Sequence, residues 1–249
     1  MKLDFETDKG IGTRATLGTI VLSTDETLEP EFAQITALDG VALYHSRIPM
    51  VTEIRADTLQ QMEQDLPASA RLLPTSLDFD VIGYGCTSAA TVIGQAGVAR
   101  AINSVFPQAK VTDPLTAIIA AANALGAKRL GFITPYIPDV SKRMRHKLEV
   151  AGFEIVAFGS FEESDDRVVA RITPKSIAAS INQVTKNADC DAVVAACTNL
   201  RCLGIISDAE QRTGTPVITS NQALSWHMLR LAGVTEPQRG FGKLFELPL

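Results

Sequence analysis

Short runs of apolar, β-branched residues alternate along the chain with longer Ala-rich or amphipathic stretches. The runs lack in/out alternation, which is typical of parallel strands that are covered on both faces. They predict strands at Leu17–Leu22, Phe79–Gly83, Arg129–Thr134, Phe153–Phe158, Asp191–Ala196 and Pro216–Thr219. The stretches between them predict helices at Ala89–Val105, Thr116–Leu125, Val140–Ala151, Pro174–Asn187, Leu203–Thr213 and Gln222–Leu231. Alternation of this kind indicates an α/β fold with parallel sheets.

An internal repeat divides this pattern into two similar halves. The string Leu17-Gly18-Thr19-Ile20 recurs 113 residues later as Leu130-Gly131-Phe132-Ile133. Cys86-Thr87 recurs 111 residues later as Cys197-Thr198, each time directly after a strand pattern. Val111-Thr112 recurs 107 residues later as Ile218-Thr219. Three matches in one order at nearly one offset predict an internal duplication.

The duplication predicts two pseudo-symmetric parallel-sheet lobes with the active site in the cleft between them. Ligands bind at the carboxyl ends of the strands in such sheets, and a shared cleft brings those ends together. We expect residues 1–114 together with 222–249 to form the N-terminal lobe, and residues 115–221 to form the C-terminal lobe.

Composition excludes several classes of protein. With 23 Lys and Arg against 28 Asp and Glu, the formal net charge is −5, and no basic run offers a site for nucleic acid. The most apolar stretch, residues 115–127, is shorter than the roughly 20 residues of a membrane span. Four Cys do not make a disulfide scaffold, and the acidic start at residues 1–8 is unlike a signal peptide. We therefore expect a cytoplasmic protein that binds neither membrane nor nucleic acid.

The repeated cysteines, Cys86 and Cys197, are the predicted catalytic residues. Each is expected in a turn between a strand and a helix, where the helix N-terminus lowers the pKa of a thiol. Thr87-Ser88 and Thr198-Asn199 add hydroxyls, an amide and backbone N–H groups, which suit a carboxylate or an enediolate. Two facing thiols, one ionised and one protonated, could move a proton from one face of a carbon to the other.

The other reading of a cysteine after a strand is a small buried hydrophobe. That reading suits Cys190 and Cys202, which have no partner in the repeat. The chain has no C-x-x-C or H-E-x-x-H pattern, so we expect no metal site. Ser88 stands where a dinucleotide fingerprint beginning at Gly83 needs its third glycine, so we expect no nucleotide cofactor.

At these residues the sequence resembles the aspartate/glutamate/hydantoin racemase superfamily, in the branch of maleate cis-trans isomerase and arylmalonate decarboxylase. The resemblance covers essentially the whole chain and is carried by LGTIVLSTDETLEPEF, GYGCTSAATVIG, TPYIPDV and AACTNLRCLGII. It is strongest to the ectoine-utilisation EutA type, over residues 20–29 and 197–201.

The resemblance implies roles for single residues. Cys86 matches a nucleophile that adds to the alkene carbon in the isomerases, and Cys197 matches the residue that handles the proton or the leaving thiolate. The decarboxylases keep only the second cysteine, which disfavours decarboxylation here. Positions that hold a substrate carboxylate in the family are matched by Thr87, Ser88, Thr198 and Tyr136. A homo-oligomer, dimer or tetramer, is likewise implied.

One position departs from the isomerase pattern. The isomerases carry Asn where this chain has Asp25, and an ionised Asp repels a carboxylate to which Asn can donate. Asp25 would instead suit an ammonium, amidine or hydroxyl group of a substrate. Its other reading is a solvated loop residue that caps a helix beginning near Thr27.

Three functions follow from these residues. The first is a cofactor-independent racemase or isomerase of a small carboxylate, amino-acid-like or ectoine-derived, with the two cysteines as acid and base. The second is a maleate cis-trans isomerase with Cys86 as covalent nucleophile. The third is a small-carboxylate binding protein without catalysis.

Overall fold

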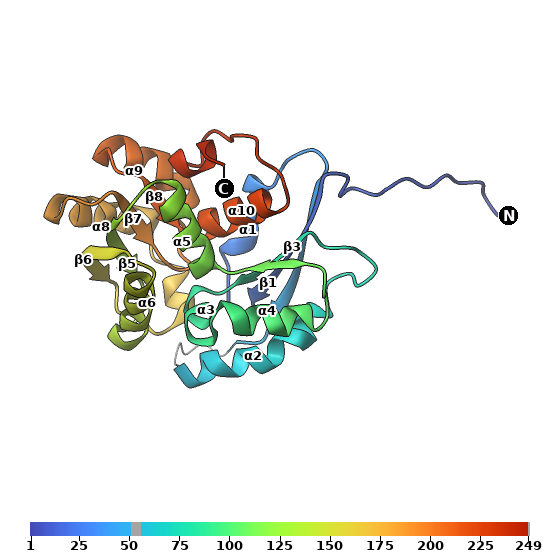
Figure 1. Cartoon of the computed structure of the whole chain (residues 1–249), viewed down its shortest axis with the longest axis horizontal. Coiled ribbons are helices and arrows are strands. Elements are labelled where there is room, and N and C mark those ends of the chain that lie inside the picture. The colour runs from blue at the N-terminus through green and yellow to red at the C-terminus, as the bar shows by residue number, and fades with distance from the viewer. Residues whose placement is uncertain (51–55, 249) are drawn as a thin grey trace.

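A computed structural model, which describes residues 1–50 and 56–248, contains two four-stranded parallel sheets (Figure 1). The first has the strand order β2-β1-β3-β4 and the second has the order β6-β5-β7-β8. The strands of the first sheet are β1 (Ala15–Leu22), β2 (Val41–Ile48), β3 (Val81–Gly85) and β4 (Lys110–Thr112). Those of the second are β5 (Arg129–Thr134), β6 (Glu154–Ser160), β7 (Ala192–Ala195) and β8 (Val217–Thr219). The predicted α/β fold with two similar lobes is confirmed.

The strand register confirms two of the three sequence matches and corrects the third. Leu17 pairs with Val81 in the first sheet, and Leu130 pairs with Ala192 in the second, as the offsets of 113 and 111 require. In the last strands, however, Gly83 pairs with Thr112 whereas Val194 pairs with Ile218. Thr112 is therefore equivalent to Ile218, and the match to Thr219 was wrong by one residue.

The physical reason for this correction is helix capping. Asp113 follows β4 and accepts hydrogen bonds from the N–H groups of Leu115 and Thr116 at the start of the next helix. Thr219 does the same after β8, accepting from Gln222 N–H. Asp and Thr are both good N-caps, so the equivalent positions differ in residue type while their role is the same.

Ten α-helices connect and cover the described strands. They are α1 (Leu28–Ile35), α2 (Ala56–Ala70), α3 (Thr87–Ile93), α4 (Gln95–Asn103), α5 (Pro114–Ala124), α6 (Pro138–Val150), α7 (Asp166–Val169), α8 (Pro174–Asn187), α9 (Ile206–Thr213) and α10 (Ser220–Leu231). Short 3₁₀ turns add η1 (Leu203–Ile205) and η2 (Lys243–Glu246). The single helix predicted over 89–105 was wrong, because Gly94, at φ +80°, separates α3 from α4.

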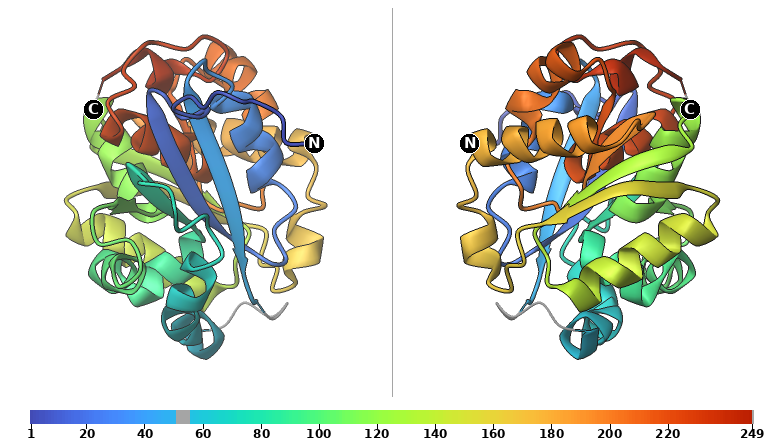
Figure 2. Two further views of the ribbon diagram at one scale, coloured as in Figure 1. Left: turned by 90° about the vertical axis from the view of Figure 1, so that its right-hand side faces the viewer. Right: turned by 90° about the vertical axis from the view of Figure 1, so that its left-hand side faces the viewer.

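Strands β2 and β4 and helices α2 and α7 were not among the predicted strands and helices, and α1 was expected only as a helix beginning near Thr27. Figure 2 shows β2 beside β1 at the edge of the first sheet. Its side chains alternate between buried and partly exposed, and Tyr44, His45 and Arg47 interrupt its apolar run. A half-exposed edge strand lacks the continuous hydrophobicity by which the buried strands were found.

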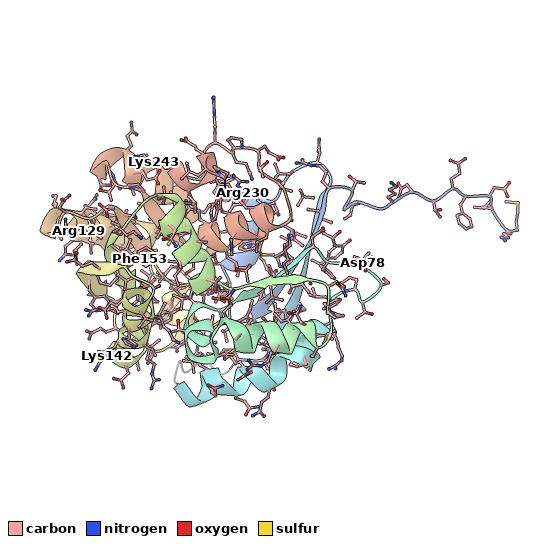
Figure 3. All side chains as sticks on the ribbon, viewed as in Figure 1. Asp78, Arg129, Lys142, Phe153, Arg230 and Lys243 are labelled. Carbon is pink, nitrogen blue, oxygen red and sulfur yellow. The ribbon has the colours of Figure 1, made fainter. Side chains whose placement is uncertain are left out.

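The equivalent helices α5 and α10 pack against each other, and each contacts strands of both sheets (Figure 1). Nearly every residue of α10 is buried. The segment after α10 is held by Arg230, whose guanidinium donates hydrogen bonds to the backbone oxygens of Val234 (2.8 Å), Phe245 (3.3 Å) and Leu247 (3.0 Å) (Figure 3). Because both central helices touch both sheets, the division into residues 1–114 plus 222–249 and 115–221 stays a prediction.

Candidate active site

Cys86 lies between the carboxyl end of β3 and the first turn of α3. Helix α3 contacts α6, which follows β5 of the second sheet (Figure 1). It is the N-cap residue of α3, and its Sγ accepts a hydrogen bond from Ala89 N–H at 3.3 Å. The Ser88 hydroxyl lies 3.5 Å from the same sulfur. The predicted position of this thiol at a helix N-terminus is therefore confirmed.

Cys197 follows β7 but precedes a turn rather than a helix. Its Sγ accepts from Asn199 N–H at 3.3 Å, and the first helical turn beyond it, η1, begins only at Leu203. The prediction of a helix directly after this cysteine was wrong. Residues 198–202 are instead held by side chains from elsewhere: Asn221 donates to Thr198 O at 2.7 Å, and Glu31 accepts from Cys202 N–H at 2.9 Å.

Burial dominates the ionisation of both thiols, which are only 2% and 4% exposed. It raises the pKa of Cys86 to about 11 against the opposing effect of Ser88 and Ala89, and it raises the pKa of Cys197 well above its ordinary value. The expectation of a net lowered thiol pKa was wrong: Ala89 N–H at the start of α3 lowers the pKa of Cys86, but burial raises it by more. A few N–H dipoles do not offset the loss of water around a thiolate.

One hydrogen bond joins the two cysteine turns. The Thr198 hydroxyl, beside Cys197, donates to the backbone oxygen of Gly85, beside Cys86, at 3.4 Å. The buried Tyr136 side chain lies close enough to Cys197 to lower the pKa of its thiol. Burial raises the pKa of Tyr136 itself, and the negative charges that Cys197 and Cys86 would carry raise it further. Both sulfurs therefore act on one phenol.

Thr87 and Asn199 are two other predicted substrate-binding residues. Their side chains are hydrogen-bonded to other groups of the protein. The Thr87 hydroxyl is hydrogen-bonded to Ser220 at 2.9 Å, at the start of α10. Asn199 accepts from Glu26 N–H at 2.9 Å and donates to Asp166 O at 3.1 Å, so it joins the loop after β1 to α7. The groups of Thr87 and Ser88 best placed for a ligand are their backbone N–H groups, in the first turn of α3.

Asp25 has the capping role that was one of the two considered for it. Its Oδ1 caps α1 by accepting from the N–H groups of Thr27 and Leu28, both at 2.8 Å. The residue is 2% exposed, so the expectation of a solvated position was wrong. Its Oδ2 is buried and has no hydrogen-bond partner within residues 1–50 and 56–248. Burial is the largest effect on Asp25 and raises its pKa. The backbone N–H groups of Leu28 and Thr27 and the side chain of Thr198 lower this pKa, whereas the charge of Asp166 raises it.

Asp166, at the start of α7, belongs to the same group of side chains, and sequence analysis missed it. It is 2% exposed and accepts from the Thr24 hydroxyl at 2.5 Å. Its charge raises the pKa values of Cys86, Cys197 and Asp25. In the sequence it ends an acidic run, residues 162–166, that resembles a solvated loop. Only the fold distinguishes it from its neighbours.

Comparison with known proteins agrees with this geometry. The family model of arylmalonate decarboxylase (Amdase) matches residues 95–245. The chain belongs to the arylmalonate decarboxylase family. It is 26% identical over 241 residues to a maleate isomerase of Pseudomonas putida, covering 92% of this chain and 96% of that one. It is 27% identical over 198 residues to an arylmalonate decarboxylase of Bordetella bronchiseptica, covering 79% and 78%.

Solved structures of relatives have the same fold. The crystal structure of the maleate isomerase Iso from Pseudomonas putida S16 matches with a TM-score of 0.84 and 26% identity, over 93% of this chain and 98% of that one. A crystal structure of arylmalonate decarboxylase matches with a TM-score of 0.74 and 25% identity, over 93% and 99%. The expected branch of the superfamily, and an enzyme of an isomerase family, are thereby confirmed.

The described residues do not gather three His, Cys, Asp or Glu side chains in a way that could hold a metal ion. Within the same part of the chain, no helix is long and apolar enough to cross a membrane. The side chains near the two cysteine turns are thiols, a phenol, hydroxyls and carboxylates. Such a set can transfer protons, add a thiolate to an electrophilic carbon, and bind charged ends of a small molecule.

Proposed function

We propose that this protein is an isomerase or racemase of a small carboxylate, in which Cys86 and Cys197 are acid and base and no cofactor takes part. The single observation that carries the proposal is the equivalence of the two thiols. They follow equivalent strands, β3 and β7, and the Thr198–Gly85 hydrogen bond joins their turns across the two lobes.

The proposed chemistry begins with one cysteine as thiolate and the other as thiol. The thiolate removes a proton from the carbon beside the substrate carboxylate, which leaves an enediolate and a new thiol. The second thiol then gives its proton to the opposite face of that carbon and becomes the thiolate. Protons balance, and the enzyme returns to its first state after the reverse turnover or by exchange with water.

Each thiol has two donors that stabilise its ionised form. The Ser88 side chain and Ala89 N–H lower the pKa of Cys86. The Tyr136 side chain and Asn199 N–H lower the pKa of Cys197. The N–H groups at the start of α3 suit the negative oxygens of the enediolate. Ser88, Thr198 and Tyr136, together with Thr87 and Asn199 through their backbones, are the proposed binding groups.

An amino-acid-like or ectoine-derived substrate fits this site better than a dicarboxylate, because Asp25 presents a carboxylate to it. The similarity of residues 20–29 and 197–201 to the ectoine-utilisation EutA type supports the same choice. We further propose that the protein is cytoplasmic and homo-oligomeric. Light scattering on the purified protein tests its oligomeric state.

The second candidate is maleate cis-trans isomerisation, which the similarity to maleate isomerases favours. In that reaction the Cys86 thiolate adds to an alkene carbon, the resulting single bond rotates, and elimination of the thiolate restores the alkene as fumarate. A covalent adduct on Cys86 would distinguish it from proton transfer. The non-catalytic alternative predicts binding without turnover.

The experiment is a screen in deuterium oxide of amino acids, ectoine-derived acids and maleate, followed by NMR. The proposal expects deuterium at the carbon beside the carboxylate of one class. Cys86→Ser and Cys197→Ser should each reduce exchange sharply, while Cys190→Ser, at a partly exposed position away from the site, should not. Fumarate and a Cys86 adduct would favour maleate isomerisation, and binding without exchange would favour the receptor.

A further inference from the structure

Two buried carboxylates lie in segments that contact the turn of Cys197, where Asn199 hydrogen-bonds Glu26 N–H and Asp166 O. Asp25 follows β1 and Asp166 opens α7 after β6, and each is 2% exposed. The Thr24 hydroxyl, one residue before Asp25, donates to Asp166 Oδ2 at 2.5 Å, which ties the two segments together. Both carboxylates act on both sulfurs, because the charges of Asp166 and Asp25 raise the pKa of Cys86 and of Cys197.

One oxygen of this pair is left without a partner. Asp25 Oδ2 is buried and makes no hydrogen bond to any residue that the structure describes, although its companion Oδ1 accepts two. The Thr198 hydroxyl lies close enough to lower the pKa of Asp25, but it has one proton, and its hydrogen bond goes to Gly85 O. A buried carboxylate oxygen without a donor costs free energy, which a bound ligand can recover.

Two arginines of the described residues, Arg47 and Arg171, are ion-paired with other carboxylates. Arg47 donates to the backbone oxygen of Asp25 at 2.9 Å, but its ion pair is with Glu29 at 2.9 Å. Arg171 is ion-paired with Glu26 at 2.5 Å. These two cations thus neutralise groups other than Asp25 and Asp166.

We infer that Asp25 and Asp166 together form the subsite for a cationic group of the substrate, an ammonium or an amidinium. The inference rests on the proposed function, because it places this group in the same site as the reacting carbon. Two carboxylates brought together by the fold repel each other, and a cation between them removes that repulsion. A planar amidinium can also give each carboxylate oxygen a charge-assisted hydrogen bond. The substrate class is therefore a small zwitterion whose carboxylate end meets the first turn of α3.

Three ligands of one size test the charge preference directly. Succinate, succinamate and 3-amidinopropanoate share a carboxylate and a two-carbon spacer, and they end in a planar group that is negative, neutral or positive. Binding to the whole protein is measured by calorimetry at about pH 8, where carboxylates with raised pKa values are more fully ionised. We expect 3-amidinopropanoate to bind at least about tenfold more tightly than succinamate, and succinate to bind most weakly.

Two variants and a matched control locate the effect. Asp25→Asn and Asp166→Asn should each lower the preference for the amidinium over succinate by about tenfold or more, because each removes one charge from the subsite. Asn keeps an acceptor for the cap of α1 and for Thr24, so folding is preserved. Asp165→Asn removes the same charge one residue away, at a partly exposed position whose carboxylate binds Arg167, and should leave the preference unchanged.

The outcomes separate this inference from the proposed function. Succinate binding as tightly as 3-amidinopropanoate would overturn the inference, and so would equal effects of all three Asp variants or no binding of any probe at millimolar concentration. Deuterium exchange that depends on Cys86 and Cys197 would still support the proposed function in each of these cases. A clear preference for the cationic ligand without such exchange would support the subsite and contradict the proposed catalytic function.

Discussion

The carboxylate of Glu31 in α1 accepts the backbone N–H of Cys202, at 2.9 Å, and in this way a first-lobe helix holds the loop that carries Cys197. The same oxygen accepts Leu203 N–H at 2.9 Å, and the other oxygen accepts from Asn221 at 2.8 Å. Asn221 also donates to Thr198 O. The buried Glu31 carboxylate thus holds the segment after Cys197 in place, where no helix directly follows the cysteine.

Replacing Glu31 tests this arrangement through pH. Burial raises the pKa of Glu31 from 4.5 to about 7, although the three hydrogen bonds oppose the change. A raised pKa in the folded protein stabilises it fully below pH 4.5, and this stabilisation is lost as the pH rises through about 7. The loss amounts to about 3 kcal/mol of the free energy of unfolding.

Glu31→Gln imitates the protonated side chain and cannot ionise. In urea unfolding at several pH values, the stability of the wild type relative to Glu31→Gln should therefore fall as the pH rises from acid to neutral. Glu29→Gln, on the exposed side of α1, serves as control. A difference between wild type and Glu31→Gln that does not change with pH would contradict this account.

Thiol labelling should follow burial rather than helix position. Because burial raises the pKa of Cys86 to about 11 and that of Cys197 well above its ordinary value, both should react slowly with iodoacetamide at neutral pH. Cys190 is only partly buried and should be modified first. Peptide mass spectrometry over time measures the order, and the fastest labelling at Cys86 would show that its thiolate is populated in the free protein.

Tyr136→Phe should slow turnover with little effect on stability. The change removes the hydroxyl that lowers the pKa of the Cys197 thiol. We expect kcat to fall by about tenfold to a hundredfold and the pH profile of the rate to shift upward, because the thiolate loses a donor. Tyr44→Phe, in the edge strand β2, is the matched control. Equal rates for the two variants would exclude Tyr136 from the chemistry.

Asn199→Ala should weaken the contact that its side chain makes with the loop after β1 and with α7. The side chain of Asn199 accepts from Glu26 N–H and donates to Asp166 O, and it is almost fully buried. Removing it leaves both groups without these partners, which should lower the free energy of unfolding by about 2–4 kcal/mol. Asn182→Ala on α8 should change it by less than about 0.5 kcal/mol. Similar unfolding midpoints for both variants would contradict this prediction.

The sequence was sufficient for the duplicated α/β fold because its buried strands are continuous apolar runs, and because each cysteine follows one of them. The structure joins the turns of Cys86 and Cys197 through the Thr198–Gly85 hydrogen bond, whereas the catalytic roles of Cys86 and Cys197 stay predictions. The sequence did not reveal that Cys197 precedes a turn, since Glu31, from the other lobe, replaces the expected helix.

Charge and depth of burial could not be predicted from local patterns. The helix N-terminus at Cys86 was correctly expected, yet the pKa of the thiol is raised because the whole fold removes water from it. Asp165 and Asp166 are adjacent and identical in type, but only Asp166 is buried at the site. Which member of an acidic run turns inward depends on contacts with Thr24 and Asn199, which are distant in sequence.

The most direct test of the two-cysteine account is the stereochemistry of proton exchange in single-cysteine variants. Once the screen has identified a chiral substrate, each enantiomer is incubated in deuterium oxide with Cys86→Ser or with Cys197→Ser. A pair of bases on opposite faces predicts that each variant exchanges the proton of one enantiomer only, and that the two variants choose opposite enantiomers. Exchange of both enantiomers by either variant, or no dependence on which cysteine is replaced, would contradict the account.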